Sequence, residues 1–526
     1  MKKTSGARMF GIITVAGLLT MAAGAQAQQV TLKSSDGTVN MTGDFVNFQD
    51  NAYVIQTALG QLRVSASRVS CTGAACPDLN SSDADFVVAG SDGIGLGLMP
   101  LVIEGYAGAR NAAASFVNTG SEGAIVADLI SDQGFGDDLV AIRVASSSTS
   151  DGLEQLRRGE AEIAMADRRI LPDEARALRD SGAGNMISPD QEHIVAIDSL
   201  IIITNPNNPI DSLDVRQLGG IYSGQITNWS QVGGPDLPIE VVIRDVGAQR
   251  TDSFTARLFG DSGATLTRDA TFVPTSSDVS LFVNQNPGGI GVVGYAFQRG
   301  ASAVNIVNQC GITMSPDAFS AKTEEYALQQ RLFLYARQDT TNPQVEDFLD
   351  FVTSPEADSV IRKAGFIGFS VDRREQSFDD SRARALLDPN ADPFEGGYMR
   401  QMLSRMVDYD RLSTTFRFRT GSAQLDERGE IDKERLIDYL ATQPNGSEVL
   451  FVGFTDSVGE FSGNLDLSQR RAAQVAEEVE SFAGSRLNGI NFTSVGYSEI
   501  APSGCNASEE GRRINRRVEV WIKSPA

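Results

Sequence analysis

The sequence has very little histidine and few of the other side chains that build catalytic or metal centres. Its 526 residues include one histidine, His193, and four cysteines. A histidine-based triad or a zinc cluster needs more of these side chains than the chain offers. The sequence therefore predicts no metal site and no other cofactor, and it favours a protein that is not an enzyme. His193 opens an apolar run and is most simply a residue at the end of a strand.

Positive charge is also scarce. Lys and Arg together number 45, against 68 Asp and Glu, and the formal net charge is −23. Nucleic acids and anionic lipid surfaces attract basic proteins, so this charge argues against both as partners. Any site for an anion must be built locally, by loops and helix ends, against an unfavourable overall field.

Long apolar runs are absent except at the N-terminus. There, residues 9–23 form an apolar run that follows a basic start and precedes the small-x-small site Ala25-Gln26-Ala27. The run is shorter than the roughly 20 residues that a bilayer span needs. We therefore predict a cleavable secretory signal peptide over residues 1–27, and an exported protein.

The few cysteines fall into two groups. Cys71 and Cys76 bracket a short loop that a disulfide would close in an oxidising compartment. Cys310 and Cys505 lie far apart in the sequence. They either pair between domains or stay reduced, and their spacing does not decide between the two.

The order of apolar and turn-forming residues predicts a multidomain protein. Residues 28–80 contain short strand-like runs broken by turn dipeptides, which indicates a small β module of about four strands. Residues 81–370 alternate strand-like and helical stretches, which is typical of an α/β domain of two lobes. Residues 371–410 are charged and broken by Asp-Pro pairs, which predicts a linker with a short helix after Gly396-Gly397. Residues 411–526 are expected to form an α+β domain.

One carboxylate and one guanidinium stand out in this last domain. A strand-like run over residues 449–452 leads to Asp456, and a helix is expected from Leu467 to Phe482 with Ser468 as its cap. Arg471 would then lie in about the first turn of that helix. Such a pair suits a zwitterionic ligand that carries an ammonium and a carboxylate, and the helix N-terminus would add attraction for the carboxylate.

The same stretch closely resembles the peptidoglycan-binding signature of the OmpA-like domain, and the resemblance extends over about 110 residues. The resembling residues are Thr455-Asp456-x-x-Gly459, Asn464, Leu467-Ser468-x-Arg470-Arg471-Ala472, Gly496-Tyr497-Ser498-Glu499, Pro502, Glu510-Gly511-Arg512 and Asn515-Arg516-Arg517-Val518-Glu519. The resemblance implies that Asp456 and Arg471 hold the diaminopimelate of the peptide stem, with Asn464 and Arg517 as further candidates. It also implies a protein of the periplasm, associated with peptidoglycan and the outer membrane.

The middle domain resembles the phosphate-binding periplasmic proteins of ABC transporters. The most distinctive match is the I-x-x-G-x-I-x-N-W run over residues 221–229, and residues 287–291 and 331–335 follow the same pattern. The resemblance implies two α/β lobes that close over phosphate or a related oxyanion. An ABC permease and outer-membrane components are the further partners that it leaves open.

Two loops offer an independent case for an oxyanion site. Ser91, Asp92 and Gly93 lie in a glycine-rich turn between a strand and a helix, and a second hydroxyl-rich loop precedes another helix. That second loop contributes Ser148, Thr149 and Ser150. Backbone amides and hydroxyls at a helix start bind anions, although each loop is also an ordinary turn in many proteins. Asp167, by the resemblance, accepts a hydrogen bond from a protonated ligand oxygen; otherwise it is a helix cap or an ion-pair partner.

One stretch departs from the family pattern. The family carries Arg-x-x-Gly-Ser-Gly-Thr, whereas this chain keeps Arg244 and Gly247 but continues with Ala248-Gln249-Arg250. Arg244, Gln249 and Arg250 are therefore candidate ligand residues, and Arg250 either replaces the lost hydroxyls as a donor or fills the cleft. The ligand is then inorganic phosphate or a larger or different anion. The alternative is a wall-anchored structural or interaction protein whose lobe has lost or changed its ligand.

Overall fold

The structure is a computed structural model. It describes residues 29–34, 40–49, 52–65, 69–73, 75–76, 84–119, 123–132, 138–244, 264–375, 393–418, 425 and 427–525. The predicted signal peptide lies outside these residues, and so do Gln249 and Arg250. Within the described ranges, no helix is both long enough and apolar enough to cross a membrane. The same residues hold no group of three or more potential metal ligands.

The chain divides into two compact units, and the first holds the predicted β module. Its five strands pair in the order β4-β3-β2-β1-β5, antiparallel throughout. The strands are β1 (Gln29–Lys33), β2 (Asn40–Gln49), β3 (Ala52–Thr57), β4 (Gly60–Ser65) and β5 (Ser70–Thr72). Alternate residues such as Leu32, Tyr53 and Ile55 are fully buried in one cluster, as a sheet with one covered face requires. The predicted disulfide between Cys71 and Cys76 is present, with the two Cα atoms 5.8 Å apart.

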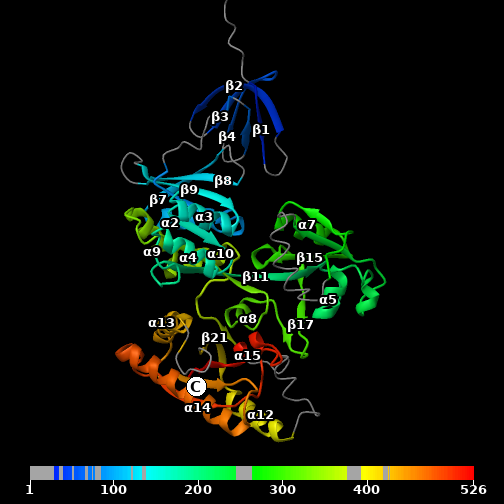
Figure 1. The fold of residues 1–526 in the computed structure, drawn as a ribbon, viewed down its shortest axis with the longest axis vertical. Helices are drawn as coiled ribbons and strands as arrows, with labels where there is room; N and C mark the ends of the chain where they lie inside the picture. The colour runs from blue at the N-terminus through cyan, green and yellow to red at the C-terminus, as the bar shows by residue number, and fades with distance from the viewer. Residues whose placement is uncertain are drawn as a thin grey trace, which may run out of the picture. The chain divides into compact units, whose positions relative to one another are not determined.

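The second unit begins with a two-lobed α/β domain built on an eleven-stranded sheet. The order is β14-β13-β15-β11-β19-β10-β6-β9-β8-β7, with β16 beside β11. These strands are β6 (Phe86–Ser91), β7 (Ala112–Asn118), β8 (Ala124–Ser131), β9 (Asp138–Ser147), β10 (Ile163–Ala166), β11 (Glu192–Thr204), β13 (Glu240–Arg244), β14 (Thr271–Val273), β15 (Gly289–Gly294), β16 (Ser302–Ala303) and β19 (Gln329–Ala336). Figure 1 shows β11 passing from the lobe of α3 and α4 to the lobe of α5 and α7, so β11 and its partner β19 connect the lobes.

Each lobe has its own core and its own helices. Lobe 1 packs α3 and α4 around a cluster that includes Leu156 and Ala164, and lobe 2 packs α5 and α7 around Tyr222 and Trp229. Lobe 2 also carries a small sheet of β12 (Ser212–Asp214), β17 (Asn305–Val307) and β18 (Thr313–Met314). The helices of the domain are α1 (Asp92–Gly95), α2 (Met99–Ala109), α3 (Thr149–Arg158), α4 (Pro172–Asp180), α5 (Val215–Tyr222), α7 (Ser276–Gln285), α8 (Ala318–Lys322), α9 (Pro343–Val352) and α10 (Pro355–Lys363).

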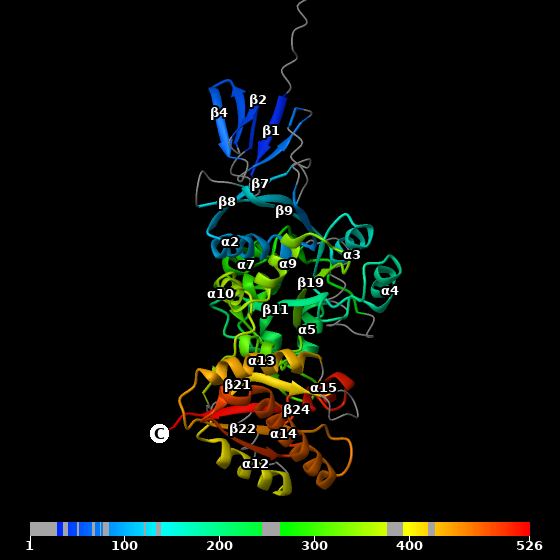
Figure 2. The same cartoon turned by 90° about the vertical axis from the view of Figure 1, so that its left-hand side faces the viewer.

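The C-terminal domain is a five-stranded sheet with helices on both faces. The strand order is β20-β21-β24-β22-β23. Its elements are β20 (Arg373–Arg374), α12 (Pro393–Met406), β21 (Asp410–Arg417), α13 (Glu427–Ala441), β22 (Glu448–Phe454), α14 (Phe461–Ala483), β23 (Asn491–Gly496), α15 (Glu509–Asn515) and β24 (Arg517–Lys523). Helices α13 and α14 cover one face, whereas α12 covers the other; Figure 2 shows α12 and α13 on opposite sides of the sheet.

The structure corrects the prediction of a linker over residues 371–410. Arg373 and Arg374 form a strand that pairs with β21. Met402 and Met406 of α12 are buried against β22 and β24. The described part of this segment therefore belongs to the C-terminal domain, because its apolar side chains complete a core that the sheet would otherwise expose.

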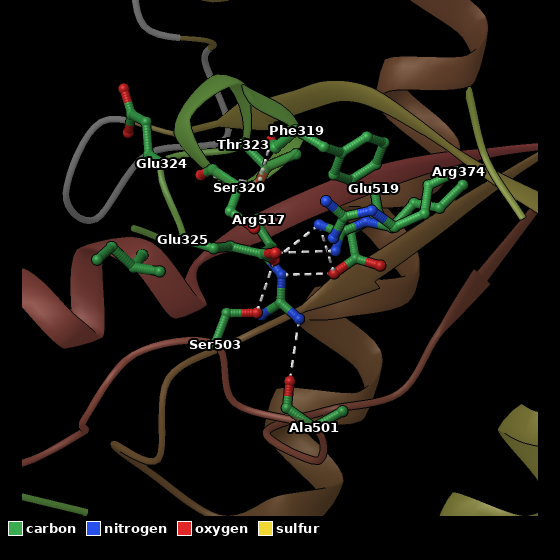
Figure 3. A network of polar contacts seen from close by, with 12 residues as sticks. Phe319, Ser320, Thr323, Glu324, Glu325, Arg374, Ala501, Ser503, Arg517 and Glu519 are labelled. Carbon is green, nitrogen blue, oxygen red and sulfur yellow. Dashed lines mark hydrogen bonds and ion pairs between the residues drawn. The ribbon is translucent and has the colours of Figure 1, made fainter. Parts of the chain in front are cut away.

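The α/β domain and the C-terminal domain meet through buried charges and a disulfide. Glu325, just after α8, accepts hydrogen bonds from Arg411 at 2.7 and 3.0 Å and from Ser503 at 2.9 Å. Its neighbour Glu324 pairs with Arg417 at 2.9 Å. Figure 3 shows Glu325 pointing toward Ser503, Arg517 and Glu519. Cys310 of lobe 2 and Cys505 of the C-terminal domain form a disulfide, which decides the pairing that their spacing left open.

Candidate functional site

Three parallel strands of lobe 1 deliver the predicted anion-binding loops to one edge of the sheet. Strand β6 pairs in parallel with both β9 and β10. Their carboxyl ends therefore meet at the same edge, where ligands of open α/β sheets bind. Ser91 ends β6, Ser148 follows β9 and Asp167 follows β10. Close packing is possible because Gly90 has a positive φ of 131°, and a Cβ there would lie 2.3 Å from the carbonyl oxygen of Met165.

Asp167 connects these loops through hydrogen bonds. The hydroxyl of Thr149 donates to its Oδ1 at 2.7 Å, and the hydroxyl of Ser91 donates to its Oδ2 at 3.3 Å. The backbone N–H of Asp167 in turn donates to the Thr149 hydroxyl at 3.1 Å. The carboxylate thus has a fixed orientation, in which it can accept a hydrogen bond from a protonated ligand oxygen.

A cavity of ≈ 350 Å³ opens at this edge between the lobes. Among the predicted residues, Ser91, Asp92, Gly93, Asp167 and Arg244 line it. Its other lining residues, which the site prediction missed, are Leu96, Gly97, Asp198, Leu200, Ile243, Thr275, Ser276, Ser277, Val292, Val293, Gly294, Phe297, Gln330, Leu332 and Phe366. The run of three hydroxyl residues at the start of α7, Thr275–Ser277, was the sequence signal that could have found the lobe 2 side.

The predicted loop after β9 serves the cavity only indirectly. Ser148 caps α3 by accepting a hydrogen bond from the backbone N–H of Asp151 at 3.1 Å. Ser150 accepts a hydrogen bond from Arg168 at 3.1 Å. Neither is among the described residues that line the cavity. Ser148 and Ser150 therefore stay predictions as ligand residues, and in the described structure their hydroxyls cap α3 and bind Arg168.

Arg244 spans the cleft. It ends β13 in lobe 2, and its guanidinium lies 2.5 Å from Oδ2 of Asp92 in lobe 1. Its Nε donates to the carbonyl oxygen of Pro274 at 3.3 Å. Both charged side chains are only about one-fifth exposed, so an anion in the cavity would compete with Asp92 for a partly desolvated guanidinium.

A third carboxyl group, Asp198, lies at the crossing strand between the lobes. Its Oδ1 accepts hydrogen bonds from the backbone N–H groups of Ser199 at 2.8 Å and Tyr295 at 3.0 Å. Burial raises the pKa of Asp198 to about 6; those two hydrogen bonds oppose the rise and the charge of Asp167 adds to it. The cavity therefore holds a carboxyl group that keeps its proton at higher pH than an ordinary aspartate does.

The second site lies at the carboxyl end of β22 in the C-terminal domain. The chain leaves the strand through Asp456, whose Oδ1 accepts a hydrogen bond from the backbone N–H of Val458 at 3.1 Å. The side chain of Asn464 donates to the carbonyl oxygens of Asp456 and Val458, both at 3.3 Å, and to Glu499 at 3.1 Å. Asn464 thus holds the loop in shape, and its part in ligand binding stays a prediction.

Helix α14 begins earlier than the sequence predicted, at Phe461 instead of Leu467. Ser468 is not its cap: its hydroxyl donates within the helix to the Leu465 carbonyl at 2.8 Å. Arg471 therefore lies in the third turn and gains nothing from the helix N-terminus. Its guanidinium sits over the ring of Phe418, 4.8 Å from the ring centre, and burial lowers its pKa.

Two adjacent arginines at the start of β24 differ in their surroundings. Arg516 places its guanidinium 2.7 Å from Oδ2 of Asp456, and the sequence prediction missed it. Arg517 is fully buried, bonded to Glu519 at 2.7 Å and to the Ala501 carbonyl at 2.9 Å. Arg517 is therefore removed from the candidate site, because a side chain enclosed in this way cannot reach a ligand. At this site Asp456 lies near the guanidiniums of Arg471 and Arg516, and Arg516 also pairs with Glu509 at 3.1 Å.

Family comparison agrees with both domains. A family model described as a PBP superfamily domain matches residues 106–356, and the model of the OmpA family matches residues 417–516. The chain joins a PBP superfamily domain to an OmpA family domain. The first domain contains the cavity between the lobes, and the second contains the Asp456 loop.

Relatives of the PBP superfamily domain include proteins named for phosphate. The phosphate-binding protein PstS of Borreliella burgdorferi is 25% identical over 230 residues, which are 42% of this chain and 78% of that protein. The protein SphX of Synechococcus elongatus is 27% identical over 241 residues, 43% of this chain and 69% of that protein. A solved ABC-type phosphate transport receptor from Vibrio cholerae is 23% identical and covers 54% of this chain and 99% of its own, with a TM-score of 0.40.

Proposed function

We propose that this protein is a periplasmic receptor for phosphate or a related oxyanion, held on peptidoglycan by its OmpA family domain. The observation that carries the first half is the meeting of Ser91, Asp167 and Arg244 at one cavity between two lobes. A hydroxyl, a proton acceptor and a guanidinium are what a singly protonated oxyanion needs. The name of the phosphate-binding relative PstS supports the same ligand class.

Binding would exchange partners that the cavity residues already have. An oxyanion replaces Asp92 beside Arg244, and the Ser91 hydroxyl turns from Asp167 to the ligand. Asp167 then accepts the ligand's own O–H, which an ion without a proton cannot offer. Asp198, with its pKa raised to about 6, provides a second carboxyl that is partly protonated in mildly acidic solution. Gln249 and Arg250 stay predictions as further donors.

The wall anchor rests on the charges around Asp456. A diaminopimelate side chain ends in an ammonium and a carboxylate, which match Asp456 on one side and Arg471 and Arg516 on the other. Holding the receptor on the wall would keep it at high local concentration in the periplasm. We propose a binding role without catalysis. An ABC permease and outer-membrane components remain predicted partners.

Export through the predicted signal peptide completes the proposal. The two disulfides, Cys71–Cys76 and Cys310–Cys505, support an oxidising compartment. Association with the outer membrane follows from the resemblance to OmpA-like domains and is part of the proposal.

Calorimetric titration of the full chain tests the oxyanion half. We expect heat with phosphate, little or none with sulfate, and a loss of at least tenfold in phosphate affinity in Asp167→Asn. The matched control is Asp173→Asn, an aspartate whose side chain is 87% exposed on α4. No heat with any oxyanion would favour the alternative, a wall-anchored structural or interaction protein.

Sedimentation with purified peptidoglycan tests the anchor. We expect the wild-type chain to pellet with the wall material, and the double variant Asp456→Ala, Arg471→Ala to stay in solution. Arg470→Ala is the control, since Arg470 is an exposed neighbour of Arg471 on the same helix. Full retention of the double variant would refute the site assignment.

A further inference from the structure

Three aromatic side chains gather at the start of α14. Phe394 and Tyr398 of α12 lie with their ring centres 5.3 Å apart, and Phe461 of α14 lies 4.9 Å from each of them. Phe394 is 57% exposed, and the other two are partly exposed. The cluster is therefore partly exposed to solvent, and an exposed apolar surface of this kind marks a contact site.

This cluster borders the loop that carries Asp456. Phe461 is the first residue of α14, and Asn464, one turn later, donates to the carbonyl oxygens of Asp456 and Val458. Val458, in the same loop, is 65% exposed. The carbonyl oxygen of Phe461 also accepts a hydrogen bond from the Ser498 hydroxyl at 2.9 Å. This bond fixes the backbone of Phe461 beside the Asp456 loop.

The chemistry of the cluster favours an uncharged ring as its occupant. A sugar ring presents a face of C–H bonds, which packs against the electron-rich face of an aromatic ring. Two exposed carboxylate residues, Glu395 and Glu460, flank the rings and disfavour an anionic lipid surface. The rings therefore suit a neutral glycan better than a membrane.

We propose that Phe394, Tyr398 and Phe461 form a sugar-stacking platform that binds the glycan strand of peptidoglycan beside the stem-peptide site. The inference rests on the proposed wall anchor and adds a second contact to it. Two amino acids separate diaminopimelate from the sugar that carries the stem, a reach of about 10 Å when extended. Phe461 lies one helical turn before Asn464, which bonds to the Asp456 carbonyl at 3.3 Å, so its ring is within that reach of a stem held at Asp456.

Two soluble ligands separate the platform from the anchor. One is the free stem peptide with diaminopimelate, and the other is the same peptide attached to its disaccharide. We expect the wild-type chain to bind the disaccharide form roughly two- to tenfold more tightly, the range that aromatic packing gives. Phe394→Leu with Phe461→Leu keeps the apolar packing, and should abolish that gain while leaving the affinity for the free peptide unchanged.

Phe482→Leu is the matched control, because Phe482 is a 56% exposed phenylalanine at the far end of the same helix. This variant should keep the gain from the sugars. Equal affinity of the wild-type chain for the two ligands would overturn the platform while the anchor stands. An equal loss for both ligands in the double leucine variant would also overturn it, because the rings would then only support the loop. Binding of neither ligand by the wild-type chain would refute the anchor itself.

Discussion

At the scale of single residues, burial separates groups that are alike in the sequence. Arg516 and Arg517 are neighbours, yet one meets Asp456 at the candidate wall site and the other is enclosed with Glu519. Both residues of the Arg517–Glu519 pair are 0% exposed. Such a pair tolerates the loss of one partner poorly, because the other charge is left buried.

Alanine variants should separate the two arginines. We expect Arg517→Ala to lower the free energy of unfolding by about 3–5 kcal/mol, measured by denaturant unfolding of the full chain. Arg516→Ala should lower it less, because the side chains of Arg516 and Asp456 are 11% and 12% exposed, and should weaken binding to peptidoglycan. The opposite pattern, with Arg516 needed for stability and Arg517 for binding, would contradict the assignment of the site.

Asp198 should leave a pH signature on stability. Its pKa is raised to about 6, above the value of an unfolded chain, so the native state holds the proton more tightly between about pH 4 and 6. Its contribution to stability is therefore present in acid and is lost as the pH rises through 6. Asn cannot titrate but keeps the acceptor oxygen for Ser199 and Tyr295. We expect the free energy of unfolding of Asp198→Asn to equal that of the wild type near pH 4. At pH 7 it should be higher than that of the wild type by on the order of 3 kcal/mol.

Thermal unfolding from pH 4 to pH 7 measures this difference. Asp180→Asn, at an exposed position at the end of α4, should run parallel to the wild type. A constant gap between Asp198→Asn and the wild type at all pH values would show that Asp198 does not titrate in this window.

At the scale of elements, the sequence predicts the order of strands and helices better than their ends. The first turns of α14 contain Gly463 and Asn464, residues typical of loops, and the predicted helix therefore began too late. In the fold, hydrogen bonds from Asn464 to the Asp456 loop hold this segment helical. Likewise α12 begins at the proline of an Asp-Pro pair, which predicts a break, although proline is well suited to the first position of a helix.

The two candidate sites differ in how far the sequence could predict them. Asp456, Asn464 and Arg471 belong to one local motif, whereas Asp198 and Thr275–Ser277 reach the cavity only through the crossing of strands between lobes. The pattern of apolar residues does not predict which distant strands become neighbours. Residues that such a strand brings to a site therefore cannot be predicted from a single sequence.

The disulfides provide a prediction at the same scale. Cys310–Cys505 joins positions 195 residues apart, and Cys71–Cys76 only 5 apart. Closing the longer loop removes more entropy from the unfolded chain, about 5 kcal/mol against about 2. We expect Cys310→Ser with Cys505→Ser to lower the thermal midpoint of the second unit clearly, and Cys71→Ser with Cys76→Ser to leave that unit unchanged. A larger effect of the short bridge on this unit would contradict the account.

At the scale of the whole second unit, the PBP superfamily domain and the OmpA family domain are held together by side-chain contacts and a disulfide as well as by the chain that connects them. Buried ion pairs from Glu324 and Glu325 and the Cys310–Cys505 bridge all attach the OmpA family domain to the segment around α8 and to lobe 2. Lobe 1 makes none of these ion-pair or disulfide contacts among the described residues. Closure over a ligand would then move lobe 1 against a fixed base.

Because these contacts couple the two domains, calorimetry should show them unfolding together. We expect one heat-absorption peak for the two domains in the wild type. A combined variant with Glu324→Gln, Glu325→Gln and serine at both cysteines of the bridge should give two peaks. Glu434→Gln, which removes only a surface pair with Arg486 inside the OmpA family domain, should keep the single peak. Two peaks already in the wild type would refute this coupling.

The central claim is that one chain both holds an oxyanion and fixes it to the wall, and co-sedimentation of radiolabelled phosphate with purified peptidoglycan tests it most directly. The account predicts that phosphate pellets with the wall material only when the protein is present. It also predicts that the label returns to solution both in Asp167→Asn and in Asp456→Ala with Arg471→Ala, for different reasons: the first variant pellets without phosphate and the second does not pellet. Wild-type protein that pellets without carrying phosphate or any other labelled oxyanion would contradict the account.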